Sequence, residues 1–125
     1  MPILVVDDDP SVRRLLSVQL GLAGYEVHIA ENGPAALLSI GRDAPDLVVL
    51  DVMMPDLDGW QVLRALRAEP RYQFLPVLML TAKVQPSDVQ LSYDLGASAV
   101  IGKPYDGERL TQMVETLLLQ ADVAS

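Results

Sequence analysis

The chain of 125 residues has no cysteine and only one histidine, His28. Disulfide bonds, thiol nucleophiles and zinc sites built from Cys or several His ligands are therefore excluded. A Ser-His-Asp triad would have to use His28, which falls in the middle of an apolar segment. We expect this histidine to pack against a sheet or to lie on the surface.

Basic residues are also scarce. The chain has 9 Lys and Arg against 17 Asp and Glu, which gives a net charge of -8 at pH 7. Nucleic acids and anionic membranes repel such a chain, so we expect it to bind neither directly. No apolar run approaches the roughly 18 residues that a membrane span needs. The sequence also has no basic segment followed by an apolar one at its start, so we expect a cytoplasmic protein.

Hydrophobic residues make up 50% of the chain and follow a repeating order. Short apolar runs predict five strands, at Ile3–Val6, Val27–Ala30, Leu47–Leu50, Val77–Leu80 and Val100–Ile101. These runs are mostly continuous instead of alternating with polar residues. Continuous apolar runs are typical of strands that are buried on both faces of a parallel sheet.

Segments with helical spacing separate the strands. They run from Pro10 to near Gly24, from Pro34 to Arg42, from Gly59 to Glu69, from Pro86 to Gly96, and onward from Asp106. The pair Asp9-Pro10 predicts an N-cap followed by the first helical residue. The order predicts one α/β domain over residues 1–125. It is a doubly wound (βα)5 fold with a five-stranded parallel sheet and helices on both faces.

Polar residues follow four of the predicted strands. They are Asp7, Asp8 and Asp9 after the first strand, Asp51 after the third, Thr81 after the fourth and Lys103 after the fifth. In open α/β sheets, ligands bind beyond the carboxyl ends of the strands, where the strand order reverses. In the flavodoxin-like order 2-1-3-4-5 that point lies between strands 1 and 3. We therefore expect Asp7, Asp8 and Asp51 to meet there.

Such a group of carboxylates needs a counterion. At about 4 Å and an effective dielectric constant near 20, each pair of carboxylates costs about 4 kcal/mol. Mg²⁺ suits a site of two or three carboxylates completed by water, and a nearby lysine suits a phosphoryl oxygen. A single Asp after a strand is more often a helix cap, as we expect for Asp9. The combined set favours a site that stabilises an aspartyl phosphate.

Four segments carry a resemblance to a known family: ILVVDDDP, LVVLDVMMPDLDGW, LMLTAK and GASAVIGKPY. In this order they resemble the receiver domains of two-component response regulators, which have the CheY-like fold. The resemblance implies that Asp51 is the phosphoacceptor. It also implies that Asp8, Asp51 and the backbone carbonyl of Met53 ligate Mg²⁺, with Asp7 acting through water.

The same resemblance implies further roles and partners. Lys103 would contact the phosphoryl group, Thr81 would be the switch hydroxyl, and Pro104 matches a cis-proline position. The donor would be a phosphohistidine on a sensor histidine kinase or a phosphotransfer protein. The response would be a conformational switch acting on a downstream effector. We expect a signalling protein, not an enzyme, that is a monomer or a weak phosphorylation-dependent dimer.

Three positions differ from the family or add detail. Val100 occupies the place of the usual switch aromatic, so the usual Thr-aromatic readout is in doubt. Met53 cannot position an attacking water as an amide or acid could, which predicts slow self-dephosphorylation. We expect Gly59 to permit a turn that other residues resist.

Two other classes of function remain. Phosphatases of the haloacid-dehalogenase type also use a strand-end aspartate, but they need a second aspartate two residues later, where this chain has Met53. A passive interaction module with a degenerate receiver fold would typically lack the acidic pair, the acceptor or the lysine. All of these are present here, so both alternatives are disfavoured.

Overall fold

The computed structural model describes residues 1–124, and side chains for residues 1–121. Strands and helices alternate in the predicted order. They are β1 (Pro2–Val6), α1 (Pro10–Leu22), β2 (Glu26–Ala30), α2 (Gly33–Arg42), β3 (Leu47–Leu50), α3 (Gly59–Ala68), β4 (Val77–Thr81), α4 (Pro86–Asp94), β5 (Ala99–Gly102) and α5 (Gly107–Ala124). A 3-10 helix, η1 (Pro70–Tyr72), joins α3 to β4 and was not predicted.

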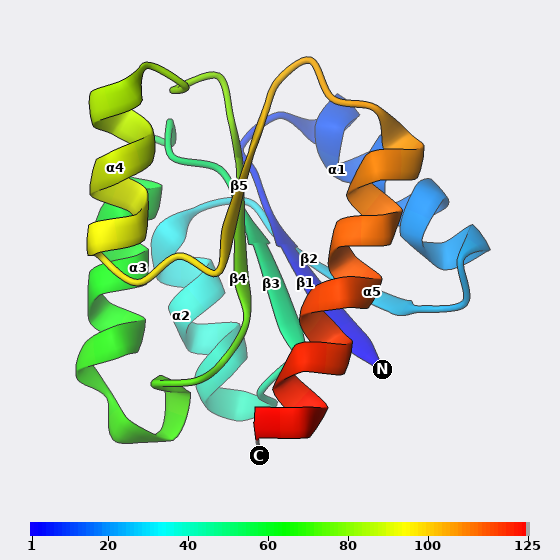
Figure 1. Ribbon diagram of the computed structural model, residues 1–125, viewed down its shortest axis with the longest axis horizontal. Helices are drawn as coiled ribbons and strands as arrows, with labels where there is room; N and C mark the ends of the chain where they lie inside the picture. The colour runs from blue at the N-terminus through cyan, green and yellow to red at the C-terminus, as the bar shows by residue number, and fades with distance from the viewer. Residues whose placement is uncertain (125) are drawn as a thin grey trace.

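The strands form a parallel sheet in the order β2-β1-β3-β4-β5, which confirms the predicted topology. Helices α1 and α5 cover one face, and α2, α3 and α4 cover the other (Figure 1). The chain leaves β1 towards one face and leaves β3 towards the other. The carboxyl ends of these adjacent strands therefore border the point where ligands bind in folds of this type.

The apolar side chains of the strands divide between two cores. In β1, Ile3 and Val5 pack into the cluster that includes α1 and α5, whereas Leu4 and Val6 pack into the cluster on the other face. Every residue of β3 and β4 is buried. Burying a Leu, Ile or Val side chain contributes about 1.5–3 kcal/mol. Strands buried on both faces therefore retain continuous apolar sequences and hold their carboxyl ends rigidly.

Polar caps start several helices close to the ends of the strands. The Asp9 side chain accepts a hydrogen bond from the Ser11 N–H at 2.9 Å, which confirms its predicted role as the N-cap of α1. At α3, Asp58 and Gln61 form a reciprocal capping box. Within residues 1–124, no helix combines the length and the apolar character that crossing a membrane requires.

Candidate functional site

Asp7 is the most enclosed carboxylate at the end of β1, with 2% of its surface exposed. Its Oδ1 accepts the Asp9 N–H at 2.9 Å, and its Oδ2 accepts a hydrogen bond from Lys103 Nζ at 2.8 Å. The Asp7 N–H donates to the Ala30 carbonyl at 3.3 Å. Both of its carboxylate oxygens are therefore engaged by groups of the protein, and the side chain is held in one orientation.

Asp51 follows β3 and is also buried, with 6% of its surface exposed. Its Oδ1 accepts the Met53 N–H at 3.3 Å, and its Oδ2 lies 3.4 Å from Lys103 Nζ. Burial raises the pKa of Asp51; the Lys103 charge opposes this rise, and the Asp7 charge adds to it. The carboxylate is thus partly desolvated, with its two oxygens in different surroundings.

Lys103 follows β5 and connects these two acids. Its backbone N–H donates to the Thr81 carbonyl at 2.9 Å, which continues the pairing of β4 with β5. Burial lowers the pKa of Lys103, but its hydrogen bonds and ion pairs with Asp7 and Asp51 outweigh burial, so the net pKa is raised. The lysine is therefore a charged donor aimed at both carboxylates. The bond between Lys103 and Pro104 is cis, as the resemblance implied.

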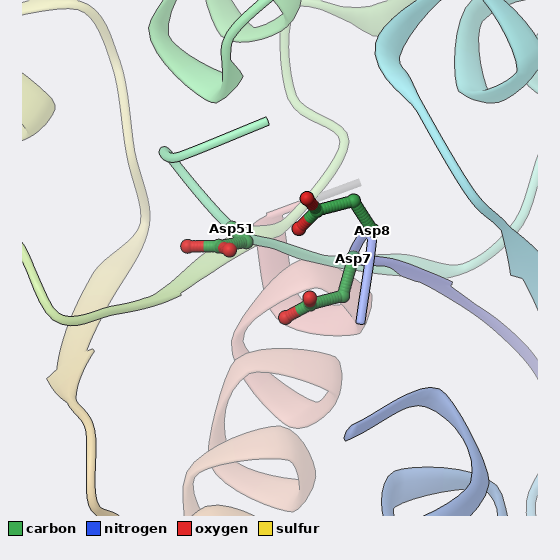
Figure 2. A group of neighbouring side chains, drawn as sticks. All are labelled: Asp7, Asp8 and Asp51. Atoms are coloured by element: carbon green, nitrogen blue, oxygen red, sulfur yellow. The ribbon is translucent and has the colours of Figure 1, made fainter. Parts of the chain in front are cut away.

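Asp8 completes an acidic cluster with Asp7 and Asp51. One carboxylate oxygen from each of the three lies within 4.8 Å of the others, and Asp8 is exposed to solvent. Figure 2 shows the three side chains gathered at the ends of β1 and β3. The donor set fits Mg²⁺, because hard divalent cations prefer carboxylate oxygens and retain several waters, which the exposed side of Asp8 admits.

Thr81 ends β4 and is fully buried, at 0% exposure. Its hydroxyl oxygen accepts the Lys83 N–H at 3.0 Å, so it is engaged with the loop that leads to α4. The position of the usual aromatic, Val100, is partly buried against the core on the face of α2 and α3. In the same region, Val84 lies against Gly102: a Cβ added at Gly102 would be 2.8 Å from Val84 Cγ1.

The predicted reason for Gly59 is wrong. The left-handed backbone conformation in this loop occurs at Asp56, with φ 69°, and not at Gly59. Instead, Gly59 begins α3 close to the backbone of Asp51. A Cβ there would clash with the Asp51 carbonyl and lie 2.8 Å from Val52 Cα. The glycine is needed for close approach of two backbone segments, which residue type alone did not distinguish from a turn.

Trp60 lies beside the loop that follows Asp51 and joins this loop to α4. It lines a pocket of about 480 Å³ together with Val52, Met53, Met54, Asp58 and Lys83. Its indole Nε1–H donates to Ser92 Oγ at 2.9 Å. Ser92 is the one residue of α4 that is buried, in a helix that the structure describes in full. The sequence carries no signal for this partner of Trp60, which is 32 residues away.

A second contact that sequence reasoning missed involves Arg13. Its Nη1 donates to the backbone carbonyl of Asp7 at 2.8 Å. The sequence places Arg13 near the start of α1, just after the acidic loop Asp7–Asp9, and this is its only signal for the contact. Arg14 has the same signal. His28, by contrast, lies where it was expected: it is half exposed on β2, 3.3 Å from Glu26 and outside the acidic cluster.

A doubly wound (βα)5 fold with this strand order is that of the CheY-like class. The family model of the response regulator receiver domain matches residues 3–115. The chain belongs to this family, whose members serve as signalling switches in two-component systems.

Individual relatives agree with this assignment. The chain is 44% identical over 118 residues to response regulator MprA of Mycobacterium leprae, which covers 94% of this chain and 51% of MprA. It is 40% identical over 123 residues to the alkaline phosphatase synthesis transcriptional regulatory protein PhoP of Bacillus subtilis, covering 98% and 50%. A solved structure of chemotaxis protein CheY4 of Vibrio cholerae matches with a TM-score of 0.88 at 34% identity, covering 93% and 97%. The chain spans about half the length of the curated relatives it matches.

Proposed function

We propose that Asp51 accepts a phosphoryl group from a phosphohistidine on a sensor kinase or phosphotransfer protein, and that the chain then switches conformation. One observation carries this proposal. The buried Asp51 carboxylate lies 3.4 Å from Lys103 Nζ, and one of its oxygens is within 4.8 Å of an oxygen from each of Asp7 and Asp8. Lys103 supplies a positive charge beside this nucleophile, and the two further acids can hold a divalent cation; both positive charges offset the negative charge that the nucleophile acquires.

The transfer exchanges one bond for another. An Asp51 carboxylate oxygen forms a bond to phosphorus while the N–P bond to the donor imidazole breaks, and the imidazole nitrogen retains the electron pair. Lys103 then donates to a phosphoryl oxygen as well as to Asp7. The Met53 N–H, which donates to Asp51 Oδ1 at 3.3 Å, helps to orient the acceptor.

Asp8, Asp51 and the backbone carbonyl of Met53 would hold Mg²⁺, and Asp7 would act through a water. The hydrogen bonds of Asp7 support this division, because both of its oxygens are already engaged by Asp9 and Lys103. When bound, the cation supplies positive charge that offsets the charge on the transferred group.

The switch would begin at Thr81. Its hydroxyl now accepts the Lys83 N–H and would turn to donate to the new phosphoryl oxygens, which breaks that bond. The phosphoryl group adds about -1.5 to -2 charges. Reversing a two-state population from 1:99 to 99:1 takes about 5.5 kcal/mol, of which a few charge-assisted hydrogen bonds supply a large part. With Val100 in place of an aromatic, the change would reach α4 through Lys83 and Val84.

The phosphorylated state would decay slowly. Met53 is 56% exposed beside Asp51, and its side chain has no group that positions a water for attack. The same residue argues against a phosphatase, because it stands where a phosphatase needs its second aspartate. The chain would therefore catalyse its own Mg²⁺-dependent phosphorylation without turning over a substrate.

Residues 1–125 would form one receiver domain that works in the cytoplasm. A net charge of -8 opposes direct contact with nucleic acid or an anionic membrane. The domain would act on a downstream effector as a monomer or as a weak dimer that forms on phosphorylation.

Incubation with Mg²⁺ and acetyl phosphate, followed by mass spectrometry, tests the proposal. We expect the mass of one phosphoryl group to be added to the wild type and not to Asp51→Asn. Multiple turnover of a small phosphoester would instead support the phosphatase, and no labelling of the wild type would support the passive module.

A further inference from the structure

Arg13 reaches back from α1 to the acidic loop. Its Nη1 donates to the Asp7 carbonyl oxygen at 2.8 Å, while its own backbone N–H donates to the Asp9 carbonyl at 3.1 Å in the first turn of the helix. The Arg13 side chain is only partly exposed. The contact therefore ties the body of α1 to the residue that directly precedes Asp8.

The peptide unit between Asp7 and Asp8 is a rigid plane, because the C–N bond has partial double-bond character. A hydrogen bond that fixes the direction of the Asp7 carbonyl therefore fixes the plane from which the Asp8 Cα projects. Arg13 thus acts on the one peptide unit that links two of the three clustered acids.

The orientation of the Asp8 carboxylate depends on this peptide plane more than the orientations of the Asp7 and Asp51 carboxylates do. Asp7 is held through its carboxylate by Asp9 and Lys103, and Asp51 is held by Met53 and Lys103. For the part of the chain with described side chains, neither the side-chain hydrogen bonds nor the ion pairs include the Asp8 carboxylate. Its direction therefore follows from its backbone and its rotamer.

We propose that Arg13 is a positioning residue for the cation site: by holding the Asp7–Asp8 peptide plane, it directs the Asp8 carboxylate towards Asp51 and so strengthens Mg²⁺ binding. This inference rests on the proposed function. Arg13 contacts neither the acceptor nor a carboxylate oxygen, so it acts through the backbone. Removing groups that orient metal ligands typically weakens metal binding about 10- to 100-fold.

Arg14 provides a matched control on the same helix. It is exposed and lines an open groove on α1 with Pro10, Ser11, Leu15 and Val18. Replacing either arginine by glutamine makes the same change in net charge, but only Arg13 donates to the acidic loop. Loss of a positive charge near the acidic cluster would by itself favour Mg²⁺, so weaker binding in Arg13→Gln than in Arg14→Gln reports the hydrogen bond and not the lost charge.

The experiment is calorimetric titration of the metal-free protein with MgCl₂ alone. We expect Arg13→Gln to weaken Mg²⁺ binding about tenfold and Arg14→Gln to change it less than about twofold. Equal affinities in the two variants would overturn the inference. If wild type itself binds no Mg²⁺, it is the proposed function that fails, so the two failures are distinguishable.

Kinetics with acetyl phosphate supply a readout that general loss of structure would not give. In Arg13→Gln we expect the Mg²⁺ concentration for half-maximal phosphorylation to rise, while the rate at saturating Mg²⁺ returns to that of wild type. A lowered maximal rate with unchanged half-saturation would contradict a positioning role. If Arg13→Gln does not fold, Arg13→Lys and Arg14→Lys are compared: weaker Mg²⁺ binding in Arg13→Lys alone supports the inference, and equal binding overturns it.

Discussion

Lys103 Nζ lies 2.8 Å from Asp7 Oδ2, closer than its 3.4 Å separation from Asp51 Oδ2. The lysine is therefore anchored on the acid that follows β1 while it faces the acid that follows β3. A phosphoryl group on Asp51 would offer it stronger acceptors at the same end of the sheet. Lys103 can then bind the phosphoryl group while it keeps its ion pair with Asp7.

Replacing Lys103 with alanine separates phosphorylation from the switch. We expect phosphorylation of the wild type to change the fluorescence of Trp60, the only tryptophan. We expect Lys103→Ala still to be phosphorylated on Asp51, but without this change in fluorescence. Loss of the cation also leaves two buried carboxylates without their partner, which costs about 2–3 kcal/mol of stability. Mass spectrometry, fluorescence and chemical unfolding measure the three effects. Arg109→Ala, which removes an exposed cation from α5, is the control. A wild-type fluorescence change in Lys103→Ala would contradict the proposed role.

Asp8 is the member of the acidic cluster whose removal best tests mutual repulsion. We expect Asp8→Ala to lose Mg²⁺ binding and, without metal, to be about 1 kcal/mol more stable, since exposed charges at about 4 Å repel by about that amount in water. Unfolding in the presence of EDTA measures the gain. Glu115→Ala removes an exposed carboxylate from α5 and should give no comparable gain. A marked loss of stability in metal-free Asp8→Ala would rule out a repulsive cluster.

Gly59 tests the packing against the backbone of Asp51. An alanine Cβ would clash with the Asp51 carbonyl, which belongs to rigid backbone, so we expect Gly59→Ala to lose at least about 3 kcal/mol of stability. Gly41 gives the opposite expectation. It lies inside α2, where an added Cβ would meet nothing within 4 Å, and Gly41→Ala should gain about 0.5–1 kcal/mol. Chemical unfolding of both variants measures the difference, and similar stabilities would refute the close approach.

The fold could be predicted from the sequence because burial of the strands and capping of the helices leave clear patterns of residues. Central strands buried on both faces must be apolar throughout, and Asp9 before Pro10 marks a helix start, so element order and strand ends could be read directly. The convergence of Asp7, Asp8 and Asp51 follows from parallel strands in an order that places β1 beside β3.

Contacts made by long side chains could not be predicted in this way. Arg13 and Arg14 are adjacent and chemically identical, yet only Arg13 donates to the acidic loop, because the helix turns the two side chains in different directions. The partnership of Trp60 with Ser92 depends on how α3 packs near α4. The role of Gly59 depends on a backbone approach between β3 and α3 that no local pattern encodes.

Ser92 provides a test of the link to α4. It accepts the Trp60 indole N–H and donates to the Asp88 carbonyl at 3.1 Å, so Ser92→Ala leaves a partly buried donor unsatisfied. We expect a loss of about 1–2 kcal/mol in stability and a change in Trp60 fluorescence before any phosphorylation. Ser87→Ala, at an exposed position of α4, is the control. Unchanged stability and fluorescence in Ser92→Ala would show that the bond does not secure α4.

The pKa of Asp51 makes the stability of the metal-free protein depend on pH. Burial raises this pKa above its ordinary value of 3.8; Lys103 opposes the rise and Asp7 adds to it. A raised carboxyl pKa means that ionisation is less favourable in the folded chain than in the unfolded chain. The resulting penalty is complete above the raised pKa and absent below the ordinary one. Asp51→Asn never ionises, so we expect it to be more stable than wild type at neutral pH.

This advantage of Asp51→Asn should shrink as the pH falls through the window between the raised pKa and 3.8, because protonation relieves the wild type of the same penalty. Urea unfolding in EDTA across that window measures it. Asp56→Asn is the control: Asp56 is exposed, and asparagine tolerates its φ of 69°. An advantage of Asp51→Asn that is the same at every pH would mean that the lost carboxyl group acts through packing, and the raised pKa would then not account for the difference.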